Sequence, residues 1–196
     1  PKDKKEAYEI VNNMNKDKNS LVVSDYSQKQ RVRKPNPPFI TATLQQVASS
    51  RLGWNAKKIM NVAQSLFSHG LITYHRTDSV SIDPKKIKEV RAKIKTLYGA
   101  KYLSKNVISY KDKNGAQSAH EAIRPTYESA PSRMSSDESK LLELISNRFM
   151  ASQMASANFE QASIKLDYKY KKDIYEFKAN GSVLKFDGFL KVYGYD

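Results

Sequence analysis

Residues 41–74, TATLQQVASSRLGWNAKKIMNVAQSLFSHGLITY, are the stretch that decides the fold class. Apolar residues recur at helical spacing on both sides of Gly53, and Asn55 is placed to cap the second of two helices. Gly70 then ends that helix, and the β-prone run 71–74 follows directly. The stretch therefore predicts two helices joined by a short turn, with a strand behind them.

The N-terminal flank predicts a helix followed by extended chain. Apolar side chains at helical spacing between Ala7 and Met14 indicate a short amphipathic helix, and residues 21–23 favour an extended segment. The prolines within residues 35–38 can continue neither element. We therefore place a boundary there.

The C-terminal flank predicts two more helices and a β-rich end. Asp83 and Pro84 are placed to start a helix that Gly99 ends, and residues 135–138 form a capping box ahead of a long amphipathic helix. From residue 162 the apolar period changes to two. That change predicts strands that alternate with turns at residues 171–173, 180–181 and 187–188.

Together these elements predict an α+β protein with one domain inserted into another. The inserted part, residues 36–160, would be a mainly helical, winged-helix-like domain. The β-rich domain would consist of residues 1–35 and 161–196, whose strands pair in one sheet.

Composition favours a cytoplasmic protein with an anionic partner. The 196 residues carry 34 Lys+Arg against 20 Asp+Glu, a formal net charge of +14, and no Cys. Residues 51–113 alone hold 14 basic and 4 acidic side chains. Attraction to phosphate is the leading interpretation, although solvated lysine-rich helix faces would give the same count. Disulfides and thiolate metal sites are excluded, and no apolar run is long enough to span a membrane.

The segment GLITYHRTDS, residues 70–79, concentrates polar and reactive side chains after the β-prone run. A phenol with a pKa of about 10 is a weak nucleophile at neutral pH, so Tyr74 would need cationic groups to act on a phosphodiester. In an extended segment Tyr74 and Arg76 point to the same side, where both could meet one phosphate. The chain has 12 Tyr, and packing is the simpler explanation for any one of them.

A second cluster, HEAIRPT at residues 120–126, supplies another imidazole and guanidinium. His120 could donate to the same phosphate or move a proton, and a structural role is the simpler explanation for this residue alone. Arg124 could clamp the phosphate or hold a structural ion pair. The sequence gives no distance between the two clusters.

Four stretches carry a family resemblance: PPFITATLQQ at 37–46, GLITYHRTDS at 70–79, AHEAIRPT at 119–126 and ANGSVLKFDGF at 179–189. In this order they resemble type IA DNA topoisomerases of the bacterial topoisomerase I type. The resemblance implies that a tyrosine attacks one DNA strand and forms a transient 5′-phosphotyrosine link, while another strand passes through the gap before religation. Tyr74 matches the family nucleophile, Arg76 the arginine two residues later and His120 the histidine of the second motif.

The same resemblance implies the architecture and the partners. The helical domain would bear the tyrosine, and the two ends would belong to a β-rich arch around the DNA hole. Mg²⁺ would be bound by a separate acidic Toprim domain of the enzyme. Because no Asp-x-Asp pattern occurs here, we expect no metal ligands in this chain and no relaxation by it alone. The expected partners are a single-stranded DNA segment and the remaining domains of the same enzyme. The expected location is the nucleoid. The candidate DNA-binding residues are Thr77, Asp78, Ser79, Arg124, Lys57 and Lys58.

Three alternatives stay open. His75 stands where bacterial relaxing enzymes usually carry Met, and a His there resembles reverse gyrases, so the chain could come from a reverse-gyrase-like enzyme. A non-catalytic winged-helix module that binds DNA would also explain the helix pair and the basic stretch. A tyrosine recombinase or type IB enzyme fits less well, because its His-x-x-Arg pattern precedes a late tyrosine. Here His120 and Arg124 are separated by three residues, and both follow Tyr74.

Overall fold

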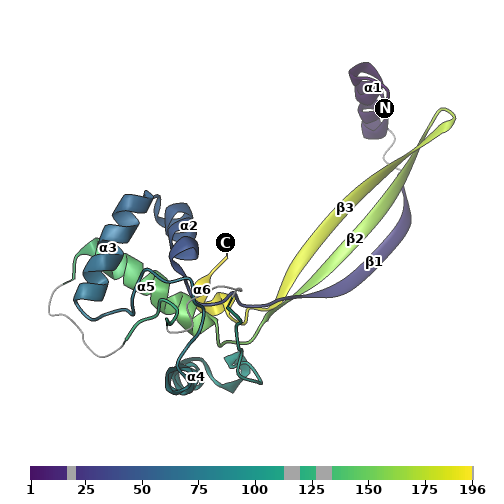
Figure 1. The fold of residues 1–196 in the computed structure, drawn as a ribbon. Coiled ribbons are helices and arrows are strands. Elements are labelled where there is room, and N and C mark those ends of the chain that lie inside the picture. Colours follow the sequence, from purple (N-terminus) through teal and green to yellow (C-terminus); the bar gives the residue numbers. More distant parts are fainter. Residues whose placement is uncertain (17–20, 113–119, 127–133, 196) are drawn as a thin grey trace. The chain divides into compact units, whose positions relative to one another are not determined.

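The computed structural model describes residues 1–16, 21–112, 120–126 and 134–195. The chain forms two compact units, one of residues 1–32 and 158–186 and the other of residues 33–157 and 187–196 (Figure 1). The first unit is a helix and a sheet, and the second is helical. The chain is thus a mixed α and β protein in which the helical unit interrupts the β-rich one.

The first unit contains a three-stranded sheet in the order β1-β2-β3. Its elements are α1 (Lys4–Lys16), β1 (Leu21–Arg33), β2 (Ala157–Tyr170) and β3 (Asp173–Phe186). The hairpin between β2 and β3 contacts α1, because the Tyr175 and Tyr170 hydroxyls donate to Glu6 and Glu9 at 2.9 and 3.3 Å. The helix and the extended segments predicted in this region are confirmed.

The turn predicted at residues 180–181 is wrong. β3 continues through it, with Asn180 opposite Ser163 and Gly181 opposite Ala162. Gly181 has no positive φ, so nothing in its backbone bends the strand. Pairing with β2 along the whole length of β3 overrides the local preference of an Asn-Gly pair.

The second unit packs its helices around one apolar core. They are α2 (Thr41–Leu52), α3 (Ala56–Ser68), α4 (Pro84–Tyr98), the 3₁₀ turn η2 (Ala100–Tyr102), α5 (Ser136–Ala151) and α6 (Leu190–Tyr193). α5 packs against α3 and α6, and α2 packs against α3. The fully buried side chains include Phe39, Leu44, Ile59, Leu66, Ile94, Ile145 and Phe149. In the described part of the chain, no helix is long and apolar enough to cross a bilayer.

The predicted helix starts are confirmed. Asn55 accepts the backbone N–H of Lys58 at 2.9 Å, and Asp83 accepts that of Lys85. Ser135 and Glu138 form a reciprocal capping box at the start of α5. Each cap satisfies a backbone donor that the first helical turn leaves without an intrahelical partner.

Two predicted strands of the second unit are wrong. Residues 71–74 make one bridge, between Ile72 and Pro125. The pairing does not extend as a ladder, because the Arg124 N–H donates to the Thr73 hydroxyl and the Leu71 N–H to the Leu66 carbonyl. The final predicted strand is the helical turn α6, where Leu190 and Tyr193 are buried at helical spacing. Over its described residues this unit has isolated bridges and no strand pairing of several residues. The helix pair is present, and the winged-helix architecture is not established.

Candidate functional site

The segment that carries Tyr74 leaves the end of α3 through Gly70, whose φ of +69° suits glycine. Exposure then alternates along the chain. Tyr74, Arg76 and Asp78 are exposed, whereas His75, Thr77 and Ser79 are buried. This period of two is that of extended backbone, so Tyr74 and Arg76 share the exposed side, as the sequence predicts.

The second cluster lies directly against this segment. Thr73 donates its N–H to the Arg124 carbonyl at 2.9 Å, and Thr126 donates its N–H to the Leu71 carbonyl at 3.0 Å. The Thr73 hydroxyl adds a bond to the Ala122 carbonyl at 2.7 Å. These bonds fix the register between the two segments.

This register brings the candidate catalytic rings together. The ring centroids of Tyr74 and His120 lie 5.9 Å apart in an edge-to-face arrangement. Phe67, near the end of α3, packs edge-on against the same phenol at 5.4 Å. Tyr74 nevertheless stays 42% exposed, so these ring contacts do not bury the residue.

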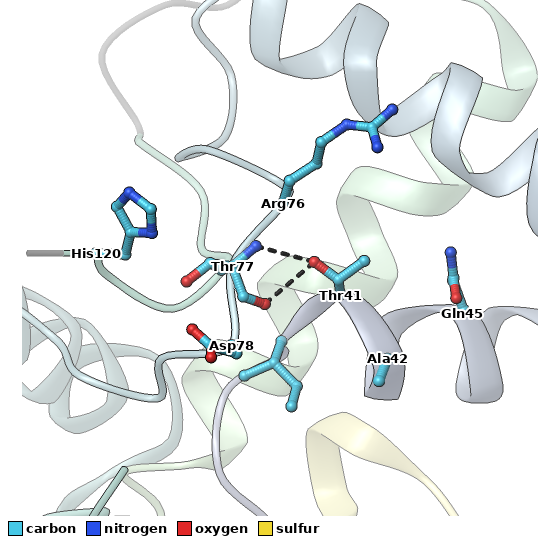
Figure 2. Close-up of a pocket in the computed structure, with 8 residues that line it drawn as sticks. Thr41, Ala42, Gln45, Arg76, Thr77, Asp78 and His120 are labelled. Carbon is cyan, nitrogen blue, oxygen red and sulfur yellow. Dashed lines mark hydrogen bonds between the residues drawn. The ribbon is translucent and has the colours of Figure 1, made fainter. Parts of the chain in front are cut away.

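The start of α2, which belongs to the stretch PPFITATLQQ at 37–46, completes a cavity of about 510 Å³. The Phe39 carbonyl accepts the Ile123 N–H at 2.8 Å, which ties the chain ahead of α2 to the second cluster. Figure 2 shows the cavity walls, with Arg76 extending away from Asp78 and His120 on the other side of the Thr77 backbone. The lining residues are Ile40, Thr41, Ala42, Gln45, Arg76, Thr77, Asp78 and His120. A guanidinium, an imidazole and the first turn of a helix are groups that suit a phosphate.

His75 faces the interior instead of this cavity. Its side chain is fully buried, and neither ring nitrogen has a hydrogen-bond partner among the residues the structure describes. Burial lowers the pKa of His75, and the charge of Arg76 lowers it further. The imidazole is therefore neutral at pH 7 and packs as an apolar ring beside Phe67 and Tyr74.

Three of the predicted DNA-binding residues are buried. Arg124 donates to Glu121 at 2.7 Å, and its side chain is only 8% exposed. The Ser79 hydroxyl donates to Asp112 at 3.0 Å, and the Thr77 hydroxyl accepts the Ser79 N–H. Arg124 also donates to the Pro125 carbonyl, and the Ser79 hydroxyl accepts the Ser81 N–H, so the polar atoms of all three side chains hold the local backbone.

The structure does not bring the two predicted lysines to the tyrosine. Lys57 and Lys58 lie in the first turn of α3, and Phe67, which touches Tyr74, lies in the last. That separation is about 15 Å along the helix axis. Lys58 also contacts Asp137 at 2.9 Å and lies over the Trp54 ring.

Sequence reasoning missed Thr41 and Thr73. Their hydroxyls connect the start of α2, the segment that carries Tyr74 and the second cluster. In the sequence, the signal for each was a threonine that lies within one of the motifs and has no chemical role assigned to it. Among the described residues, no group of three or more His, Asp or Glu side chains is arranged to hold a metal ion. The structure thus places groups that suit a phosphate around one cavity, with the Tyr74 phenol packed against one of them, His120.

The comparisons with known proteins all indicate similarity to DNA topoisomerases. The family model described as DNA topoisomerase matches residues 1–196. DNA topoisomerase 1 of Helicobacter pylori strain J99 is 41% identical over 99% of this chain and 27% of its own length, and that of Pasteurella multocida is 42% identical over 87% of this chain and 20% of its own length. The full-length topoisomerase I structure from Thermotoga maritima matches 90% of this chain and 30% of its own, with a TM-score of 0.76 and 35% identity. The chain therefore spans less than a third of each of these relatives.

Proposed function

This chain belongs to the type IA DNA topoisomerases of the bacterial topoisomerase I type, and from that membership we propose that Tyr74 is the nucleophile that cleaves one DNA strand. The observation that carries the proposal is the position of its phenol. It is exposed, it lies 5.9 Å ring to ring from His120, and it shares its side of the segment with Arg76.

In the proposed reaction the Tyr74 oxygen attacks the phosphorus of a phosphodiester in a single-stranded segment. A bond forms between that oxygen and phosphorus, the bond from phosphorus to the 3′ oxygen breaks, and the phenolic proton is released. The 3′ oxygen leaves as a hydroxyl after gaining a proton. Religation reverses these steps once another strand has passed through the gap.

We assign roles by exposure and by the groups each side chain contacts. Arg76 and His120 would bind the phosphate oxygens, with His120 also placed to move a proton, because both line the cavity. Asp78 would border the strand. Thr77, Ser79 and Arg124 would act through the backbone that they hold, which is the structural alternative for Arg124.

Other parts of the enzyme complete the proposal. Mg²⁺ would be held by a Toprim domain outside this chain, and the chain alone is expected not to relax supercoiled DNA. The helical unit would be the tyrosine-bearing domain, and the β-rich unit would be part of the arch. We place the protein in the cytoplasm with the nucleoid, because its proposed substrate is there.

The test is covalent trapping of a single-stranded oligonucleotide by the complete enzyme that contains this chain. Tyr74→Phe keeps the ring and removes the nucleophilic oxygen, so the adduct should disappear after denaturation while noncovalent binding stays within about twofold. Tyr8→Phe is the matched control, since Tyr8 is another exposed phenol, 60% accessible, in the other unit. An adduct that persists in Tyr74→Phe, or vanishes in Tyr8→Phe, would reject the assignment.

The same experiment separates the proposal from a non-catalytic DNA-binding module. Such a module would bind the oligonucleotide equally well with and without the Tyr74 hydroxyl, and neither protein would form an adduct. The polarity of the covalent link separates the proposed type IA reaction from that of a type IB enzyme, because a type IA enzyme retains the phosphate at the 5′ end.

A further inference from the structure

The first residue of α2 is bound to the segment that carries Arg76. The Thr41 hydroxyl donates to the His75 carbonyl at 2.8 Å and accepts the Thr77 N–H at 2.9 Å. The Thr41 N–H donates to the Thr77 carbonyl at 2.9 Å. Figure 2 shows the Thr41 hydroxyl facing the Thr77 backbone. The residues immediately before and after Arg76 are thus held by one threonine.

These bonds serve the segment and not the helix. α2 starts with the Leu44 N–H bound to the Ile40 carbonyl, a bond that needs no side chain. A different threonine, Thr43, bonds locally, because its hydroxyl accepts the Ile40 N–H at 3.0 Å. Removing the Thr41 hydroxyl would therefore leave the helical bonds of α2 in place.

Among the described residues, the segment has few other polar attachments at this point. It belongs to no helix or strand, and at its two ends it is held by the bridge from Ile72 to Pro125 and by the bond from Ser79 to Asp112. Between these ends, the buried His75 ring makes no hydrogen bond to any described residue. Thr41 therefore supplies the polar attachment in the middle of the segment, where Arg76 projects.

We propose that Thr41 is a positioning residue that fixes the backbone on either side of Arg76 and so aims its guanidinium at the scissile phosphate. It touches no reacting atom, and its effect passes through Arg76. The inference rests on the proposed function of the site and adds a residue to it. A displacement of about 1 Å in a catalytic group can cost on the order of 100-fold in rate.

The experiment uses the complete enzyme with Thr41→Val, which keeps the shape and removes the hydroxyl. Single-turnover cleavage of an oligonucleotide should slow by about 10- to 100-fold, while its dissociation constant changes by less than about threefold. Thr41→Ser should restore the rate, because it keeps the donor and the acceptor. Thr43→Val is the matched control at the same helix end and should cleave at the parental rate.

A double-mutant cycle then tests the route of the effect. In an Arg76→Ala background, Thr41→Val should slow cleavage by less than about twofold, since the group it positions is gone. Equal losses in Thr41→Val and Thr43→Val, or a full loss that persists without Arg76, would overturn the proposal. If Thr41→Val does not fold by circular dichroism, Thr41→Ala takes its place in every comparison. Failure of the Tyr74 assignment would show separately, as an adduct in Tyr74→Phe.

Discussion

Glu121→Gln should destabilise the helical unit by removing the charge that balances a buried guanidinium. The Glu121 carboxylate receives two hydrogen bonds, from the Arg124 guanidinium at 2.7 Å and from the Asp83 N–H at 3.0 Å. A glutamine has one oxygen for these two donors, so in either orientation its amide N–H₂ faces a donor. The Arg124 cation would then be left without a counter-ion beside it.

The expected loss follows from how deeply the pair is buried. Breaking a fully buried ion pair costs about 3–5 kcal/mol, and the Arg124 side chain meets that condition at 8% exposed. The Glu121 side chain is 33% exposed, so water screens part of the interaction. We therefore expect a loss of about 2 kcal/mol in the free energy of unfolding.

Urea unfolding of the 196-residue chain at pH 7, followed by circular dichroism, measures this loss. The matched control is Glu89→Gln, which breaks a more exposed pair with Lys86 on α4, with the Glu89 side chain 55% accessible, and should cost no more than about 0.5 kcal/mol. Adding Arg124→Met to Glu121→Gln should recover stability, because the unbalanced charge is gone. A loss no larger than that of Glu89→Gln would refute the role of the ion pair.

Acid and salt provide two further predictions. Hydrogen bonds from Ser65 and then Ser135 lower the pKa of Glu138 from its ordinary value of 4.5 to about 2. Its stabilisation is therefore complete above pH 4.5 and lost as the pH falls toward 2, and Glu138→Gln should flatten that part of the stability curve in urea titrations. For single-stranded DNA, Lys57→Ala should reduce the slope of log affinity against log salt by about 0.7, the contribution of one phosphate contact, and Lys58→Ala by less, because Lys58 already contacts Asp137. Equal or absent changes in anisotropy titrations would contradict the salt prediction.

The elements that the sequence predicts correctly depend on bonds within one turn of chain. Asn55, Asp83 and the box at residues 135–138 each bond to a backbone donor two or three residues away, so composition at those positions is sufficient. The failures at residues 71–74 and at α6 have distant causes. The first depends on the Arg124 N–H, which bonds to the Thr73 hydroxyl and not to the Thr73 backbone, and the second on the face that α5 offers to Leu190 and Tyr193.

The site, like the fold, has some features with local causes and others with distant causes. The shared side of Tyr74 and Arg76 follows from the period of an extended chain, which the sequence contains. The approach of His120 to Tyr74 depends on a backbone register set by Thr73 and Thr126, far apart in sequence. No local pattern encodes that register. The burial of Arg124 and Ser79 is likewise a tertiary result.

The sheet order has a consequence for how the protein is made. β1 and β2 are neighbours in the sheet, yet residues 34–156, nearly the whole helical unit, separate them in the chain. During synthesis β1 leaves the ribosome long before its partner exists, and the ends of that insertion must meet before the two strands can pair. The hairpin of β2 and β3 needs only a short turn and can form at once. The first strand to be translated is therefore the last to be paired, and early folding of the helical unit shortens the time that β1 spends with open edges.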